Sequence, residues 1–181
     1  MKPQKGFSLT ELMVVTAIVA ILLGIAIPSY KYLTTSYRMS AEVNSLLGDL
    51  QFARAEAVKR GNNVVVCVSS SGAGCTGGDN FAPGWIVFSD ANTNGTFDAG
   101  DTLLKVQIPF SGTTPDTFET STTVTAITFN REGFASTTAG FVPTTVTLQE
   151  PSANINYRRC LQITPAGMLS VQSHVGNPAS C

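Results

Sequence analysis

The chain has 181 residues, of which 43% are hydrophobic and only 13% are charged, with 11 basic and 12 acidic side chains. This length is enough for one domain with a real core plus an N-terminal anchor. The balanced charge argues against a surface that coats nucleic acid broadly. One histidine, no nucleophile elbow and no phosphate-binding loop predict a protein that is not an enzyme.

The N-terminus carries a short basic leader that ends at Gly6, followed by Phe7, a lone acid at Glu11 and an apolar run at 12–27. Counted from Phe7, the segment has 21 residues, enough to span a bilayer as a helix. A secretory signal peptide is excluded, because its cleavage site would follow the apolar run and its core would hold no acid. The leader lysines place the N-terminus in the cytoplasm and the domain in the periplasm.

The segment Gly6-Phe7-Ser8-Leu9-Thr10-Glu11, with the apolar run and Pro28, resembles the N-terminus of type IV pilins and type II secretion pseudopilins. The resemblance implies cleavage between Gly6 and Phe7 by a prepilin peptidase, and N-methylation of Phe7. It also implies a filament built on these helices, in which a neighbour's N-terminus neutralises Glu11 and sets the register. Pro28 is expected to bend or loosen the helix. After cleavage, 9 basic residues face 12 acidic ones, a net charge of −3.

The partners that the resemblance implies are major and minor pilins in a hetero-oligomeric filament, the prepilin peptidase and an inner-membrane assembly platform. The expected location is the inner membrane with a single span, and then a pilus or pseudopilus. The expected segments are a leader at 1–6, a transmembrane and filament-core helix at 7–28, an amphipathic helix at 29–61 and a periplasmic β-rich domain at 62–181.

Within the amphipathic helix, apolar residues recur at helical spacing and predict packing on a sheet; they are Val43, Leu46, Leu47, Leu50, Ala53, Ala57 and Val58. Arg54, Lys59 and Arg60 are interpreted as complementing the helix dipole, with Gly61 as the cap. Seven strands are expected after it, at 64–69, 85–89, 103–108, 124–130, 145–149, 158–164 and 168–172. Hairpin turns are expected at 130–133 and 164–167. The fold class is α+β, type IV pilin-like, with the long helix packed on an antiparallel sheet.

Four cysteines lie outside the anchor, and a periplasmic location makes disulfides the default. Three pairings are open in principle. The order along the chain favours two local bridges, Cys67–Cys75 and Cys160–Cys181. A zinc site is disfavoured, because the chain has no Cys-x-x-Cys motif.

Residues 53–67, 75–78, 84–101 and 127–133 resemble the GspH/FimT family of minor pilins and minor pseudopilins. This resemblance implies a minor pilin that helps to prime assembly at or near the filament tip. The alternatives are a DNA-binding competence pilin or a minor pseudopilin of type II secretion.

Some family members bind DNA through a Gly-Arg-x-Arg motif, and the matching place here, 167–170, has no arginine. Arg158 and Arg159 are candidate substitutes. Adjacent side chains of a strand point to opposite faces, so the two cannot both serve one site. The competing interpretation is one solvated arginine and one paired with an acid.

The segment 90–101 matches a calcium loop, which makes Ca²⁺ the candidate cofactor. The candidate ligands are Asp90, Asn92, Asn94, Thr96 through its carbonyl, Asp98 and Asp101. Asp101 stands where glutamate is usual and reaches less far, so the affinity is expected to be low. The alternative is an Asx-rich turn in which these side chains bond to their own backbone. Both interpretations remain open, and calorimetry with calcium distinguishes them.

Overall fold

The computed structural model describes residues 6, 8–110, 116–121, 123–138, 140–176 and 181. Two compact units divide the chain, Met1–Arg38 and Met39–Cys181. The 52-residue helix α1 (Leu9–Arg60) contributes residues to both units.

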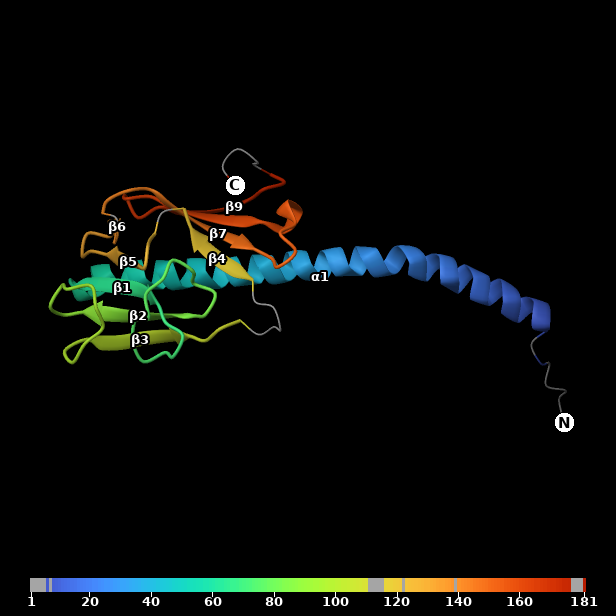
Figure 1. The fold of residues 1–181 in the computed structure, drawn as a ribbon, viewed down its shortest axis with the longest axis horizontal. Coiled ribbons are helices and arrows are strands. Elements are labelled where there is room, and N and C mark those ends of the chain that lie inside the picture. The colour runs from blue at the N-terminus through green and yellow to red at the C-terminus, as the bar shows by residue number, and fades with distance from the viewer. Residues whose placement is uncertain (1–5, 7, 111–115, 122, 139, 177–180) are drawn as a thin grey trace. The chain divides into compact units, whose positions relative to one another are not determined.

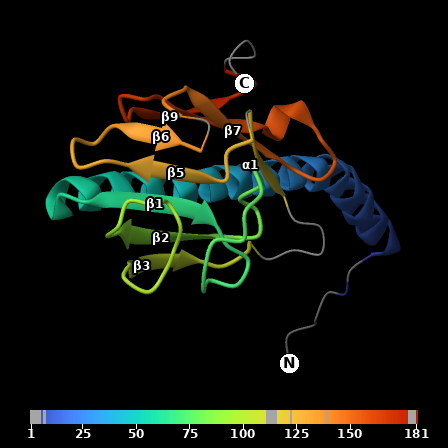
Figure 2. The ribbon, with the colours of Figure 1, turned by 60° about the vertical axis from the view of Figure 1, so that its left-hand side comes forward.

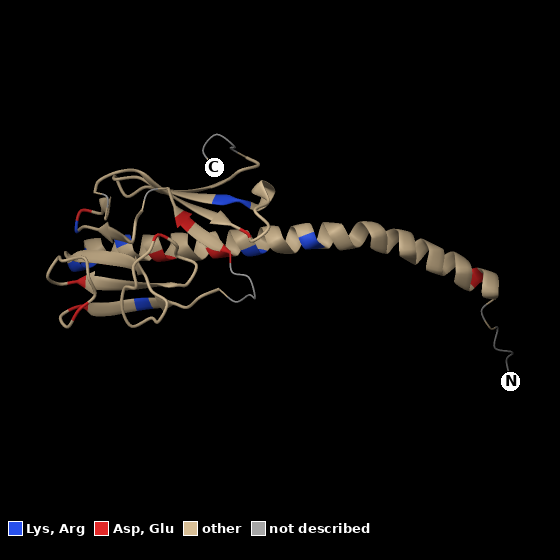
Figure 3. Ribbon diagram, viewed as in Figure 1, with Lys and Arg blue, Asp and Glu red and all other residues tan. Residues whose placement is uncertain are grey.

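In the first unit, α1 is apolar along one long stretch and carries few charges (Figure 3). It is long and apolar enough to cross a membrane, and none of its most apolar window is buried. Pro28 stands inside the helix, which continues without a break on both sides. Pro28 removes one backbone donor from the helix, and the expected bend or loosening at this position stays a prediction.

The second unit holds two antiparallel sheets beside its part of α1, where a single sheet was expected (Figure 1). The five-stranded sheet has the order β3-β2-β1-β5-β6, and the four-stranded sheet has the order β4-β7-β8-β9. The strands of the first sheet are β1 (Asn63–Val68), β2 (Trp85–Asp90), β3 (Thr102–Gln107), β5 (Ala126–Phe129) and β6 (Ala135–Thr137). Those of the second are β4 (Thr117–Thr120), β7 (Thr144–Gln149), β8 (Arg159–Ile163) and β9 (Leu169–Ser173), with a short 3-10 turn η1 (Ile155–Tyr157) before β8.

The main core lies between α1 and the two sheets. Most of the expected helix positions are buried in it, but Val58 is 55% exposed, so the apolar stripe ends before the last helical turn. Trp85 is fully buried, and its indole N–H donates to Asp49 at 2.9 Å. Asp49 also pairs with Lys105, so the buried carboxylate has both a neutral and a charged partner.

The strands of the five-stranded sheet lie side by side next to α1 (Figure 2). A second, smaller core lies on the face of this sheet opposite the main core. Alternate residues of β1 point to opposite faces, so Val64 and Val66 join the main core while Val65 and Cys67 join the second. Phe97, from the loop after β2, packs on this second core, with its ring centroid 5.2 Å from that of Phe88. Both faces of β1 are therefore buried.

The basic residues near the end of α1 have two different roles, one for Lys59 and Arg60 and another for Arg54. Lys59 and Arg60 both pair with Glu56, at 3.0 and 2.6 Å, and their hydrogen bonds, Arg60 first, lower the pKa of that carboxyl. Gly61 ends the helix with φ +70° and donates to the Ala57 carbonyl, as expected of a cap.

Arg54 does not act at the helix end, contrary to the expectation. Its guanidinium donates to the carbonyls of Gly133 and Ala166, at 3.0 and 3.3 Å. These belong to hairpin turns of the two different sheets, so Arg54 joins both turns to α1.

Two strands were not anticipated, β4 and β6, of four and three residues. Both are rich in Ser and Thr and too short to show an alternating pattern. Pairing with β7 and β5 defines them as strands. The seven expected strands are all present, with ends shifted by one or two residues.

Candidate functional site

The expected processing and assembly site lies at the start of α1. Gly6 is exposed, and Phe7 lies outside the described residues. Glu11 is exposed in the first turn of the helix, where a carboxylate interacts favourably with the helix dipole. The Glu11 backbone N–H donates to the Ser8 hydroxyl at 3.2 Å. Ser8 therefore caps the helix, and the Ser-x-x-Glu spacing, a capping-box signal, could have revealed this from sequence.

The loop between β2 and β3 brings the six proposed calcium ligands into one segment. The buried Asp90 carboxylate accepts the backbone N–H groups of Asn94 and Gly95, at 3.3 and 2.8 Å. Asp101 accepts those of Ala91 and Asp98, at 2.9 and 3.0 Å. Both ends of the loop are thus closed by carboxylate-to-backbone hydrogen bonds.

The middle of the same loop is organised around Asp98. One of its oxygens accepts the side-chain amides of Asn92 and Asn94, at 2.9 and 2.7 Å, and these bonds, Asn92 first, lower the Asp98 pKa. Thr96 donates to the Asn94 side-chain oxygen from both its backbone N–H and its hydroxyl, each at 2.8 Å. These are the bonds of an Asx-rich turn.

The residues of the loop fit a cation only in part. Gly95 has φ +75° and stands where a calcium loop needs glycine for its sharp turn. In the described part of the chain, however, no three His, Cys, Asp or Glu side chains converge closely enough to hold a metal ion. The carboxylate oxygens instead meet N–H groups of the loop itself. Calcium binding here stays a prediction.

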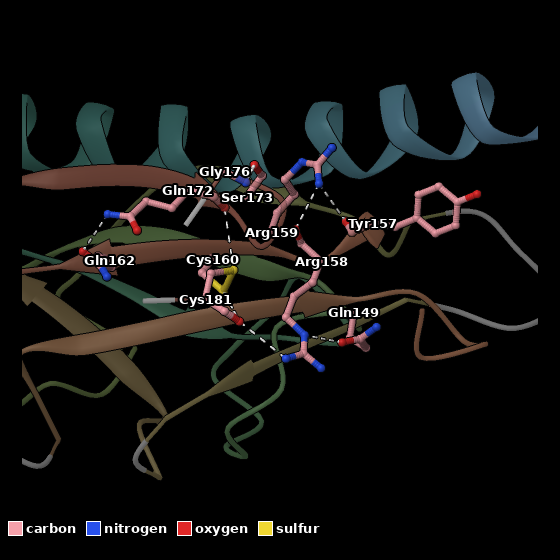
Figure 4. Close-up of a disulfide and its surroundings, with 10 residues drawn as sticks. All are labelled: Gln149, Tyr157, Arg158, Arg159, Cys160, Gln162, Gln172, Ser173, Gly176 and Cys181. Atoms are coloured by element: carbon pink, nitrogen blue, oxygen red, sulfur yellow. Dashed lines mark hydrogen bonds between the residues drawn. A yellow bond between two sulfur atoms is a disulfide. The ribbon is translucent and has the colours of Figure 1, made fainter. Parts of the chain in front are cut away.

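The two candidate DNA-binding arginines are Arg158, which directly precedes β8, and Arg159, its first residue, and their side chains point to opposite sides, as expected (Figure 4). The Arg158 side chain donates to the Gln149 amide oxygen at 2.6 Å and to the Cys181 carbonyl at 3.4 Å. Arg159 donates to the Ser40 hydroxyl of α1 and to the backbone carbonyls of Tyr157 and Arg158. Both are half-buried, so neither is the solvated arginine of the competing interpretation.

The segment 167–170, where the arginine motif would fall, runs from the hairpin turn into β9 and presents Met168, which is 67% exposed. Gly167 has φ +72°, and a Cβ on it would collide with the Gly133 carbonyl oxygen and come within 2.9 Å of the Arg54 side chain. A basic group that contacts this turn is Arg54, whose donors are directed at backbone carbonyls.

The four cysteines form the two bridges that the sequence favoured, Cys67–Cys75 and Cys160–Cys181. The Cys67–Cys75 bridge joins the loop after β1 to the second core, because Cys67 is a member of that core. The second bridge holds the C-terminal residue against β8 (Figure 4). The cysteines therefore act as structural cross-links.

Together, the apolar helix with a capped, acidic N-terminus and the sheet domain packed on its second half define a type IV pilin-like protein. A model for the type II transport protein GspH matches residues 42–167, and one for the prokaryotic N-terminal methylation motif matches residues 1–27. The chain belongs to the GspH family.

Solved structures agree on the fold. Two crystal forms of the type IV minor pilin FimU from Pseudomonas aeruginosa PAO1 match with TM-scores of 0.56 and 0.53, each at 18% identity. The matches cover 85% and 82% of this chain and 97% and 98% of FimU. At this identity the likeness concerns the fold alone.

Among curated relatives, two fimbrial proteins of Pseudomonas aeruginosa are 42% identical over 65 residues, which is 36% of this chain and 42% of theirs. The pilin-like protein PilA1 of Thermus thermophilus is 32% identical over 100 residues, covering 54% of this chain and 56% of PilA1. The matches thus span about half the length of these relatives or less.

Proposed function

We propose that this protein is a minor pilin that helps to prime the assembly of a type IV pilus at or near the filament tip. The observation that carries the proposal is the uncovered apolar segment of α1 with Glu11 exposed in its first turn. An apolar helix of this kind needs lipid before assembly and other subunits after it. A single carboxylate at its start, once in hydrocarbon, requires a matched cation, which makes it a device for register.

The test is the amount of major pilin that can be sheared from the surface of cells lacking this gene. We expect surface pilin to fall strongly, to return with the wild-type gene, and not to return with Glu11→Ala. Glu132→Gln is the matched control, since it removes an exposed acid from a hairpin turn of the second unit. Immunoblots of the membrane fraction verify that each variant accumulates.

Unchanged surface pilin in the deletion strain would contradict a role in the pilus. Because the matching family model is that of a type II transport protein, a type II secretion pseudopilus would then be the next candidate. The amount of protein that the same strain secretes would test it. DNA reception has less support, because Arg158 and Arg159 are directed at groups of their own chain. A gel-shift assay with duplex DNA at low salt tests it directly.

A further inference from the structure

The loop between β2 and β3 contains a reactive dipeptide, Asn94-Gly95, that the proposed function does not use. It is the one place in the sequence where glycine follows asparagine. Because glycine has no Cβ, its backbone nitrogen is sterically open to attack the preceding side chain. Asn94 is exposed, so water reaches its amide.

Two donors polarise the Asn94 side-chain carbonyl. The backbone N–H and the hydroxyl of Thr96 both lie 2.8 Å from Asn94 Oδ1. Donors placed in this way stabilise the negative charge that develops on an amide oxygen when a nucleophile adds to its carbon. They also direct the Asn94 side-chain oxygen forward along the chain to residue 96, past the intervening Gly95.

An acceptor for the proton of the nucleophile is already in place. The Gly95 N–H donates to Asp90 Oδ2 at 2.8 Å, and Asp90 is 1% exposed. A carboxylate at this distance can take the proton as the nitrogen forms its new bond. The N–H lies in the plane of its peptide, whereas the nitrogen attacks perpendicular to that plane, so the hydrogen bond does not block attack.

We propose that Asn94 is a site of intramolecular deamidation promoted by its own loop. The Gly95 nitrogen bonds to Asn94 Cγ and loses its proton through Asp90, the Cγ–Nδ2 bond breaks, and ammonia leaves with that proton. Water then opens the resulting five-membered imide at either carbonyl, which gives aspartate or isoaspartate at position 94. No oxidant or further reactant is needed.

The product changes the loop. Asn94 Nδ2 now donates to Asp98 at 2.7 Å, and deamidation replaces this donor with an ionised oxygen beside the same carboxylate. Two carboxylates at that distance repel each other, so the bonds around Asp98 are lost. Phe97 packs on the second core from the same loop, so the loosening extends to that face of the five-stranded sheet.

The experiment incubates the full-length protein in detergent micelles at mildly alkaline pH and follows position 94 by peptide mass spectrometry with separation of isoaspartate. We expect deamidation in the folded protein to be about tenfold faster than in the same protein unfolded in urea, because only the folded loop provides the Thr96 and Asp90 contacts. A folded rate equal to or below the unfolded rate overturns the proposal. Asn154, which precedes isoleucine, is the internal control and should stay intact.

Two variants at Thr96 test whether its hydroxyl assists the deamidation of Asn94. Thr96→Val preserves the shape and the backbone donor but removes the hydroxyl, and should slow the folded rate about threefold, as expected for the loss of one neutral hydrogen bond among several. Thr96→Ser keeps the hydroxyl and should react at the wild-type rate. If the two folded variants deamidate at equal rates, the Thr96 hydroxyl does not assist the reaction and the proposal is overturned. Circular dichroism of both verifies that each is folded.

Discussion

At the scale of single residues, Arg54 illustrates how a surface cation can have a structural role. It is the donor to two carbonyls in turns that are far apart in the sequence, at Gly133 and Ala166. The turn of Gly167 comes close enough to Gly133 that only glycine fits there. Sequence alone places Arg54 near a helix end, where dipole complementation is the simplest interpretation. Its true partners depend on two hairpins folding back to the same point.

We expect Arg54→Ala to lower the free energy of unfolding by about 1–2 kcal/mol, because two backbone acceptors lose a charged donor. Chemical denaturation of the second unit, followed by Trp85 fluorescence, measures this. Arg131→Ala is the matched control, since Arg131 pairs with its exposed neighbour Glu132 and should change stability by less than about 0.5 kcal/mol. Equal effects of the two substitutions would contradict the role of Arg54.

The loop carboxylate at Asp98 should make the loop sensitive to acid. Hydrogen bonds from Asn92 and then Asn94 lower its pKa below the ordinary 3.8. A depressed pKa in the folded state means that the stabilisation is complete above 3.8 and is lost as the pH falls through the lower, folded value. The side-chain amide signals of Asn92 and Asn94 in an NMR titration should therefore change with a midpoint below 3.8. A midpoint above that value would show that the loop does not favour the ionised form.

At the scale of elements, α1, the capping glycine, the strands other than β4 and β6, and both disulfides could be predicted, because each carries a local signal. The apolar spacing of the helix, the runs of valine in β1 and the order of the cysteines are such signals. β4 and β6 have none, because their few Ser and Thr residues become strands only through pairing with β7 and β5. For the same reason the division into two sheets was not predicted. The role of Glu11 in assembly stays a prediction, whereas the Ser8 cap beside it has a sequence signal in the Ser-x-x-Glu spacing.

The loop between β2 and β3 leads to a prediction about calcium affinity at the scale of one element. Its carboxylate oxygens already accept backbone N–H groups, so a cation would have to compete with these bonds. We therefore expect calcium to produce heat in calorimetry only in the millimolar range, as in weak calcium sites. Asp101→Asn should abolish that heat. No heat at millimolar calcium removes the calcium hypothesis, and micromolar binding would mean that the loop rearranges around the metal.

At the scale of the whole molecule, the two units have different roles. The second unit holds the folded core, and the first holds the apolar helix segment. The second unit has its own core, which includes Met39 and Val43 of α1 and strands from both sheets. The first unit offers exposed apolar residues and no buried core among its described residues. The two units should therefore depend on different surroundings.

A chain that begins at Ser29 should consequently fold and stay in solution without detergent. We expect its thermal unfolding midpoint, measured with both disulfides intact, to match that of the full-length protein in micelles within a few degrees. It should not restore surface pilin in the deletion strain, because it lacks the apolar helix and Glu11. Failure of this shortened chain to unfold cooperatively would show that the second unit needs the first.

The bridge between Cys160 and Cys181 also has a mechanical consequence. β9 (Leu169–Ser173) lies inside the loop that this bridge closes, whereas β8 begins at its other end. A pulling force applied at Cys181 is therefore transmitted through the disulfide to β8 and bypasses β9. The chain between the two cysteines, whose sequence separation is 21, cannot be drawn out, which withholds about 70 Å of extended chain from a pulling force.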